Sequence, residues 1–91
     1  MVNIKGLDKA EVLLALWKHS HEQGMSFFGT FTNNPTLGDC RNALKQCNNY
    51  IDYFNGRVIK VDFSGDEFNP GLYDRDCGSG AAQRAVDSIR K

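Results

Sequence analysis

The sequence predicts a small α+β domain in which a short antiparallel sheet lies against helices. Three stretches place apolar or small residues at helical spacing, and two of them follow a capping residue. The dipeptide Asn55-Gly56 separates two β-prone runs, which is the strongest short-range signal for a hairpin. A chain of 91 residues has room for one core, so we expect residues 1–91 to form a single domain that gains stability as a homo-oligomer.

The first predicted helix spans residues 9–22. Asp8 is placed to accept backbone N–H bonds of its first turn, and Glu11 follows three residues later, which is the spacing of a capping box. Gly24 is a natural stop. The apolar stripe of this helix, which should face the core, consists of Val12, Leu13, Leu16 and Trp17.

Two further helices are predicted at residues 37–47 and 80–90. Thr36 caps the first of these, with Asp39 three residues further on. Its stripe consists of Leu37, Cys40, Leu44 and Cys47. The last helix has a modest stripe of Ala82, Ala85, Val86 and Ile89.

The strands are predicted at residues 25–32 and on both sides of the Asn55-Gly56 turn. Residues 25–32 are rich in aromatic and β-branched side chains, and Asn33-Asn34-Pro35 ends the run. A two-residue turn pairs Phe54 with Arg57 and Tyr53 with Val58. This register places Tyr53 and Lys60 on the same, outward face of the hairpin. The element order is then α-β-α-β-β-α.

Charge and cysteine content limit the classes of function. The chain has 11 basic and 11 acidic residues, and a balanced charge argues against a general DNA- or RNA-binding protein. No apolar run is long enough to span a membrane, and the N-terminal residues lack the apolar region of a signal peptide. Three cysteines, an odd number, make a poor disulfide framework. We therefore expect a cytoplasmic protein without membrane association.

The candidate binding segment is the loop at residues 64–78 together with the start of the last helix. The loop is rich in Gly, Pro and Asp, so we expect no regular structure there, and loops of this length are usually functional. Gly78 and Gly80 flank a helix start, where a ligand can approach free backbone N–H groups. With Arg75, and with Arg57 or Lys60 from the hairpin, this segment could hold a phosphate. The alternative is plain helix capping by Asp76 or Ser79, since the lysine of a P-loop is absent.

No residue pattern predicts a catalytic or metal centre. The carboxylates of this region could bind a divalent cation, but they lack EF-hand spacing and more often bond to turn N–H groups. They are Asp62, Asp66, Glu67, Asp74 and Asp76. His19 and His21 lie two residues apart on a helix and so point to different sides. No histidine is placed near Cys77 by the sequence. We predict no catalytic residue, no metal ligand and no cofactor.

The chain has more aromatic residues than a minimal core requires. Phe27, Phe31 and Phe63 fit a core. Three others could either fill the core or stack on a nucleotide base, namely Tyr53, Phe68 and Tyr73.

Two motifs resemble a set of small phage and prophage proteins. Residues 55–82, NGRVIKVDFSGDEFNPGLYDRDCGSGAA, are similar to their pattern x-G-R-V-x-K-V-D-(L/F)-S-G-D followed by Y-D-R-D-x-G-x-G-A-A. The first helix ends in Gln23-Gly24-Met25-Ser26-Phe27, which also looks like theirs. Cys77 stands where that pattern usually has Asn, and residues 30–49 match little.

The resemblance implies an antidefence protein of the anti-CBASS sponge type, acting in the cytoplasm of an infected bacterium. Such a protein binds a cyclic dinucleotide or oligonucleotide immune signal and withholds it without cleaving it. It needs phosphate donors and stacking faces, it is often a small oligomer, and it needs no catalytic residues. The expected ligand-binding residues are Tyr53, Arg57, Lys60, Tyr73, Asp74, Arg75, Asp76, Gly78, Ser79 and Gly80.

Each of these residues has an expected role. Arg57, Lys60 and Arg75, with the N–H groups of residues 78–80, would face phosphates. Tyr53 and Tyr73 would stack on bases. Asp74 or Asp76 would accept from a base edge or orient Arg75.

Two other functions remain open at this point. One is an anti-CRISPR-like inhibitor that binds a host protein directly, which would require an exposed apolar or charged patch. The other is a small metal-dependent nucleotide hydrolase that uses the aspartate cluster.

Overall fold

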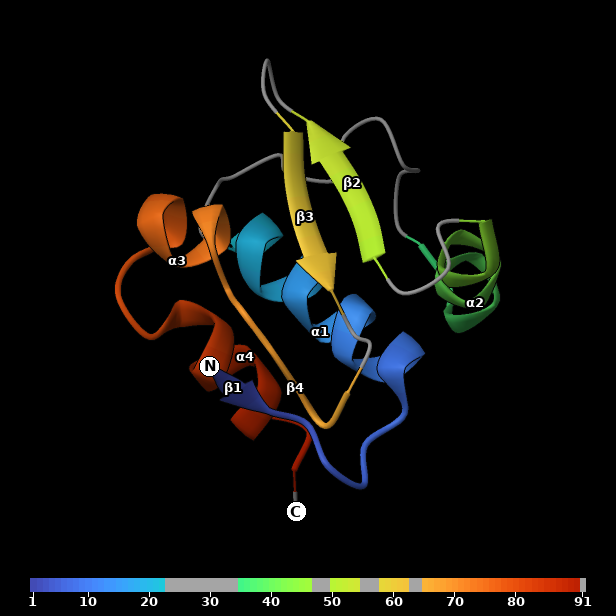
Figure 1. Ribbon diagram of the computed structural model, residues 1–91, viewed down its shortest axis with the longest axis horizontal. Helices are drawn as coiled ribbons and strands as arrows, with labels where there is room; N and C mark the ends of the chain where they lie inside the picture. The colour runs from blue at the N-terminus through green and yellow to red at the C-terminus, as the bar shows by residue number, and fades with distance from the viewer. Residues whose placement is uncertain (23–34, 47–49, 55–57, 63–64, 91) are drawn as a thin grey trace.

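The described part of the chain combines helices with antiparallel strand pairs, in agreement with the predicted α+β class (Figure 1). The computed structural model describes residues 1–22, 35–46, 50–54, 58–62 and 65–90. The elements, in chain order, are β1 (Val2–Asn3), α1 (Lys9–Glu22), α2 (Leu37–Gln46), β2 (Tyr50–Phe54), β3 (Val58–Asp62), β4 (Glu67–Phe68), α3 (Leu72–Cys77) and α4 (Ala81–Asp87). The strand predicted at residues 25–32 lies outside the described residues.

Helix α1 lies at the centre of the fold and has the predicted bounds (Figure 1). Asp8 caps it, because its Oδ1 accepts a hydrogen bond from Ala10 N at 2.9 Å. The predicted capping box is only half formed, since Glu11 makes no return bond among the described residues. The predicted stripe is buried at Val12, Leu13 and Leu16, and α1 contacts α2 on one side and α4 on the other.

Helix α2 begins at a complete reciprocal cap. Asp39 N donates to Thr36 Oγ1 at 3.1 Å, and Thr36 N donates to Asp39 Oδ2 at 2.9 Å. These bonds confirm the predicted start, and the helix extends to Gln46, the last described residue of this stretch. Cys40 on this helix is completely buried, and burial together with the neighbouring Asp39 raises the pKa of its thiol to about 11. Cys47 lies outside the described residues.

The hairpin is present, but the predicted register is wrong by one residue. Strands β2 and β3 are antiparallel, with Phe54 opposite Val58 and Tyr53 opposite Ile59. The connection between the paired residues is therefore three residues long, 55–57, rather than the two residues of the predicted turn. In this register Lys60 pairs with Asp52. Tyr53 and Lys60 thus stand at positions of opposite parity in the ladder and do not share a face as predicted.

The segment predicted to be an irregular loop contains a strand and a helix. Strand β4 pairs with β1, with Val2 opposite Phe68. Helix α3 follows a turn in which Tyr73 N donates to Pro70 O at 3.0 Å. Phe68 and Tyr73 are both buried, so contacts with the core hold these two short elements in place. The absence of regular structure predicted for residues 64–78 is wrong for this reason.

The core lies between α1, α4 and the β1–β4 pair, and residues of α2 and α3 also contribute to it. Helix α4 is shorter than predicted for residues 80–90, and Ile89 N donates to Val86 O in a turn beyond its end. The most deeply buried side chains are Tyr73, Phe68, Leu13, Leu16, Val12, Val86 and Cys40. Among the described residues, no helix is both long and apolar enough to cross a membrane.

Candidate functional site

Most of the predicted site residues lie at the corner where α3 turns into α4. This corner, residues 72–84, contains Gly78, Ser79 and Gly80 between the two helices. Gly78 has φ 109° and Gly80 has φ 76°, conformations that favour glycine over other residues. The two glycines thus serve the tight turn between the helices.

Tyr73 is a core residue, and its predicted role as a base-stacking ring is wrong in this structure. Its side chain is only 1% exposed. The hydroxyl donates to Leu16 O on α1 at 2.9 Å and lies 3.2 Å from His19 Nδ1. Because a hydroxyl has a single hydrogen, Nδ1 of His19 is the donor to Tyr73 Oη in this arrangement. Tyr73 therefore fastens α3 to α1. Phe68, another aromatic whose role the sequence left open, is also in the core.

Burial also sets the ionisation of this tyrosine. Burial, followed by the nearby Cys77, raises the pKa of the Tyr73 hydroxyl well above its usual value. The hydroxyl stays protonated over the physiological range and keeps its hydrogen bond to Leu16. In this structure the hydroxyl joins α3 to α1.

The Asp74 carboxylate lies at the start of α4, where the sequence predicted that a phosphate could bind. Its Oδ1 accepts a hydrogen bond from Ala82 N at 2.9 Å. Its backbone carbonyl accepts from Gly78 N at 2.9 Å, and Gly78 O accepts from Ala81 N at 3.0 Å. A carboxylate at a helix N-terminus satisfies its N–H groups and complements its dipole.

This arrangement corrects one predicted role. The N–H group of Gly78 is used within the corner and is not available to a phosphate. Asp74 has a role that was not predicted for it, because its Oδ1 accepts from the backbone of α4. Helix α4 does have a side-chain cap, as the alternative interpretation expected, and a carboxylate that provides it is that of Asp74.

Arginine 84 is part of this corner and was missed by the sequence analysis. Arg84 Nη1 donates to Ser79 O at 3.0 Å, and the side chain is exposed. A Cβ placed on Gly80 would lie 3.3 Å from Arg84 Nη1, so the absence of a side chain at Gly80 makes room for the guanidinium group. The four-residue spacing between Gly80 and Arg84, one helical turn, is the signal that could have found it.

The remaining predicted residues are described to different extents: some with their side chains, some only by their backbone, and Arg57 not at all. Arg75 is exposed on α3. Tyr53 and Lys60 lie in β2 and β3, and α3 contacts β3, so the hairpin and the corner are neighbours. Arg57 lies outside the described residues, and only the backbone of Asp76 is described, within α3.

The described acidic residues do not form a metal site. No group of three or more His, Cys, Asp or Glu side chains that could hold an ion occurs among the residues that the structure describes. The two histidines of α1 have separate partners, as their spacing indicated: His19 lies at Tyr73, whereas His21 stacks on Trp17 with ring centroids 5.0 Å apart.

In comparisons with known proteins, no family model, curated protein or solved structure matches this chain.

Proposed function

We propose that this protein is a non-catalytic antidefence protein that binds and sequesters a cyclic dinucleotide or oligonucleotide immune signal. The observation that supports this proposal best is the contact between α3 and β3. It brings the helix that carries Arg75 beside the strand that carries Lys60. The two sequence segments expected to share the ligand are therefore neighbours in space, although they come from different parts of the chain.

The corner itself supports an anion-binding role through its arginines. Arg75 and Arg84 are both exposed, and Arg84 is anchored on Ser79 O. Guanidinium groups bind phosphate through paired N–H donors, and an anchored group loses less conformational entropy on binding. The Ser79 hydroxyl is exposed at the same turn and can donate a further hydrogen bond. In this proposal Arg75 and Arg84 take the phosphates, with Lys60 of β3 and Arg57 as further donors.

We assign no base-stacking ring: Tyr73 belongs to the core, and Tyr53 stands on the opposite face of the hairpin from Lys60. Asp74 keeps the corner in shape and contacts no ligand. A balanced overall charge is compatible with this site, since a cyclic dinucleotide presents only two phosphates and needs local rather than global neutralisation.

A ligand panel tests the proposal. The purified full-length protein is mixed with cyclic di- and trinucleotides, and the thermal midpoint is measured with and without each one. A ligand at about 100 times its Kd stabilises the folded state by about 2.7 kcal/mol, which for a domain of this size raises Tm by about 10 °C or more. The complex is then heated and the released nucleotide is analysed by chromatography.

Three results distinguish the candidate functions. A clear shift followed by recovery of the intact nucleotide supports sequestration. A shift followed by a changed nucleotide would replace sequestration by hydrolysis. No shift with any member of the panel would overturn the proposal.

A further inference from the structure

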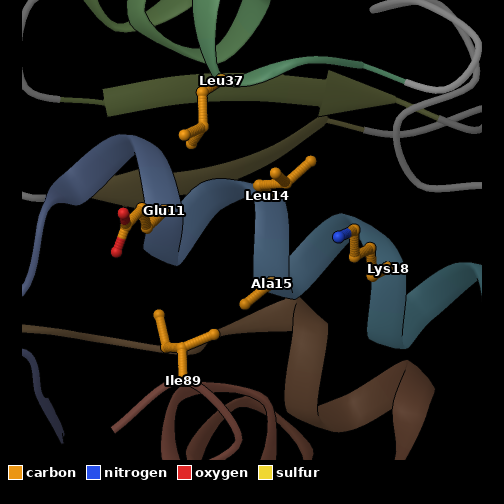
Figure 2. A pocket seen from close by; sticks show the side chains of 6 residues that line it. All are labelled: Glu11, Leu14, Ala15, Lys18, Leu37 and Ile89. Atoms are coloured by element: carbon orange, nitrogen blue, oxygen red, sulfur yellow. The ribbon is translucent and has the colours of Figure 1, made fainter.

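Helix α1 borders an apolar groove that lies between α2 and α4 (Figure 2). Its apolar lining comes from all three helical regions and consists of Leu14, Ala15, Leu37 and Ile89. Its volume is about 220 Å³. Pockets for drug-sized ligands usually measure about 300–1,000 Å³, so this groove is too small to enclose a dinucleotide.

Two opposite charges on α1 stand at the two ends of the groove. Figure 2 shows Glu11 and Lys18 flanking Leu14 along the helix. They are seven residues apart, about 10 Å along the axis. Both side chains are exposed, and neither makes a hydrogen bond or ion pair within the part of the chain that the structure describes. By contrast, Asp8 just before this helix is paired with Arg41 at 3.1 Å.

We propose that this groove binds a second copy of the same chain, with the two α1 helices antiparallel. A twofold axis perpendicular to α1, level with Leu14 and Ala15, places Glu11 opposite the partner's Lys18. The same axis places Lys18 opposite the partner's Glu11, and each Leu14 meets the apolar residues of the other groove. The patch is thus complementary to itself, which is the requirement for a twofold interface.

Charge also decides the orientation of the two copies. A parallel arrangement would set Glu11 against Glu11 and Lys18 against Lys18, and like charges across an interface are unfavourable. The antiparallel arrangement gives two attractive pairs around the apolar centre. This proposal uses other residues than the arginine corner and stands or falls independently of the proposed ligand.

Charge reversal in the full-length protein tests the antiparallel pairing. We expect the wild-type chain to sediment as a dimer at high concentration, and Glu11→Lys or Lys18→Glu alone to weaken self-association at least tenfold. An equimolar mixture of the two variants should form a heterodimer, because each lysine of one chain then faces a glutamate of the other. Raising the salt concentration should weaken both the wild-type dimer and the heterodimer.

Matched variants separate this effect from a general change of charge. The control variants are Glu22→Lys and Lys45→Glu. Glu22 lies on α1 outside the groove, and Lys45 lies in the last turn of α2. Both should dimerise like the wild type, and the thermal midpoint of the monomeric form of every variant checks that it is folded.

A wild-type chain that is monomeric at all concentrations would overturn the proposal. A failure of the mixed variants to associate would do the same, as would a loss of self-association in the matched controls. A monomer whose groove variants instead lose binding to a different protein would assign the groove to that partner.

Discussion

Replacing Asp74 by alanine should destabilise the protein, because this carboxylate joins two helices. In the structure Asp74 Oδ1 accepts from Ala82 N at 2.9 Å across the turn between α3 and α4. Losing a side-chain cap costs about 0.5–2 kcal/mol, and losing a negative charge at a helix N-terminus costs about 0.3–1 kcal/mol. These effects overlap, so we expect a loss of about 1–2 kcal/mol in the free energy of unfolding. For a domain of this size, Tm should fall by about 5–15 °C.

Two further variants divide this effect into its parts. Asp74→Asn keeps a side-chain oxygen that can accept from Ala82 N but removes the charge, so it should lose about half as much stability as the alanine variant. Asp87→Ala is the matched control. Its carboxylate accepts from Gln83 at 2.9 Å on the exposed side of the same helix, and such surface changes are usually within about 0.5 kcal/mol.

Thermal and denaturant unfolding, followed by circular dichroism, measure these differences. If Asp74→Ala had the stability of the wild type, the capping role would be wrong. If it kept that stability and lost nucleotide affinity, Asp74 would be a ligand contact, as the sequence analysis first expected.

Two other residues give predictions of the same kind. Tyr73→Phe keeps the buried ring but removes the bond to Leu16 O, so it should cost about 1 kcal/mol in unfolding free energy, measured by denaturant titration; a cost near zero would contradict the anchoring role. Burial raises the pKa of the Cys40 thiol from its usual value near 9 to about 11, so at pH 8 an alkylating reagent should modify the half-buried Cys77 well before Cys40. As the pH rises, Cys40 loses its proton in the unfolded chain before it does so in the folded protein. Its contribution to the free energy of unfolding should therefore be constant below pH 9 and should fall between pH 9 and about 11. If the free energy of unfolding of the wild type rose over this range relative to Cys40→Ala, this reasoning would be contradicted.

Local signals in the sequence were sufficient to predict where the first two helices begin. The Asp8 cap and the Thr36–Asp39 cap both depend on residues two or three positions apart, and both are formed. Such short-range hydrogen bonds are a property of the segment itself and need no knowledge of the rest of the fold.

Features that depend on distant contacts were missed or wrongly placed. Helix α3 has six residues and follows Pro70-Gly71, so its composition resembles a turn, and it is held by the burial of Tyr73 against α1. The cap of α4 is eight residues away in sequence, beyond the range of capping motifs. The hairpin was predicted from its turn residues, but the ladder that forms fixes a longer connection and a different register.

The two segments assigned to the candidate site are neighbours in the fold, but several of their residues have structural roles that the sequence did not predict. The sequence grouped the Gly78–Gly80 turn with the hairpin, and α3 contacts β3. The sequence could not show that the Asp74 carboxylate already bonds to the backbone of α4, or that Arg84 bonds to Ser79 O in this turn. Both facts follow from how two short helices meet, which is a tertiary property.

The measurement that tests the central claim most directly is the affinity of Arg75→Ala for the cyclic nucleotide that gives the largest thermal shift. Isothermal titration calorimetry on the wild type, on this variant and on Arg41→Ala gives the comparison. Arg41 is an exposed arginine on α2 whose pairing with Asp8 contributes little stability, so it controls for the loss of a positive charge. Binding should be lost in Arg75→Ala while the variant stays folded, and should be retained in Arg41→Ala. Wild-type affinity in Arg75→Ala would contradict the placement of the ligand at the α3–α4 corner.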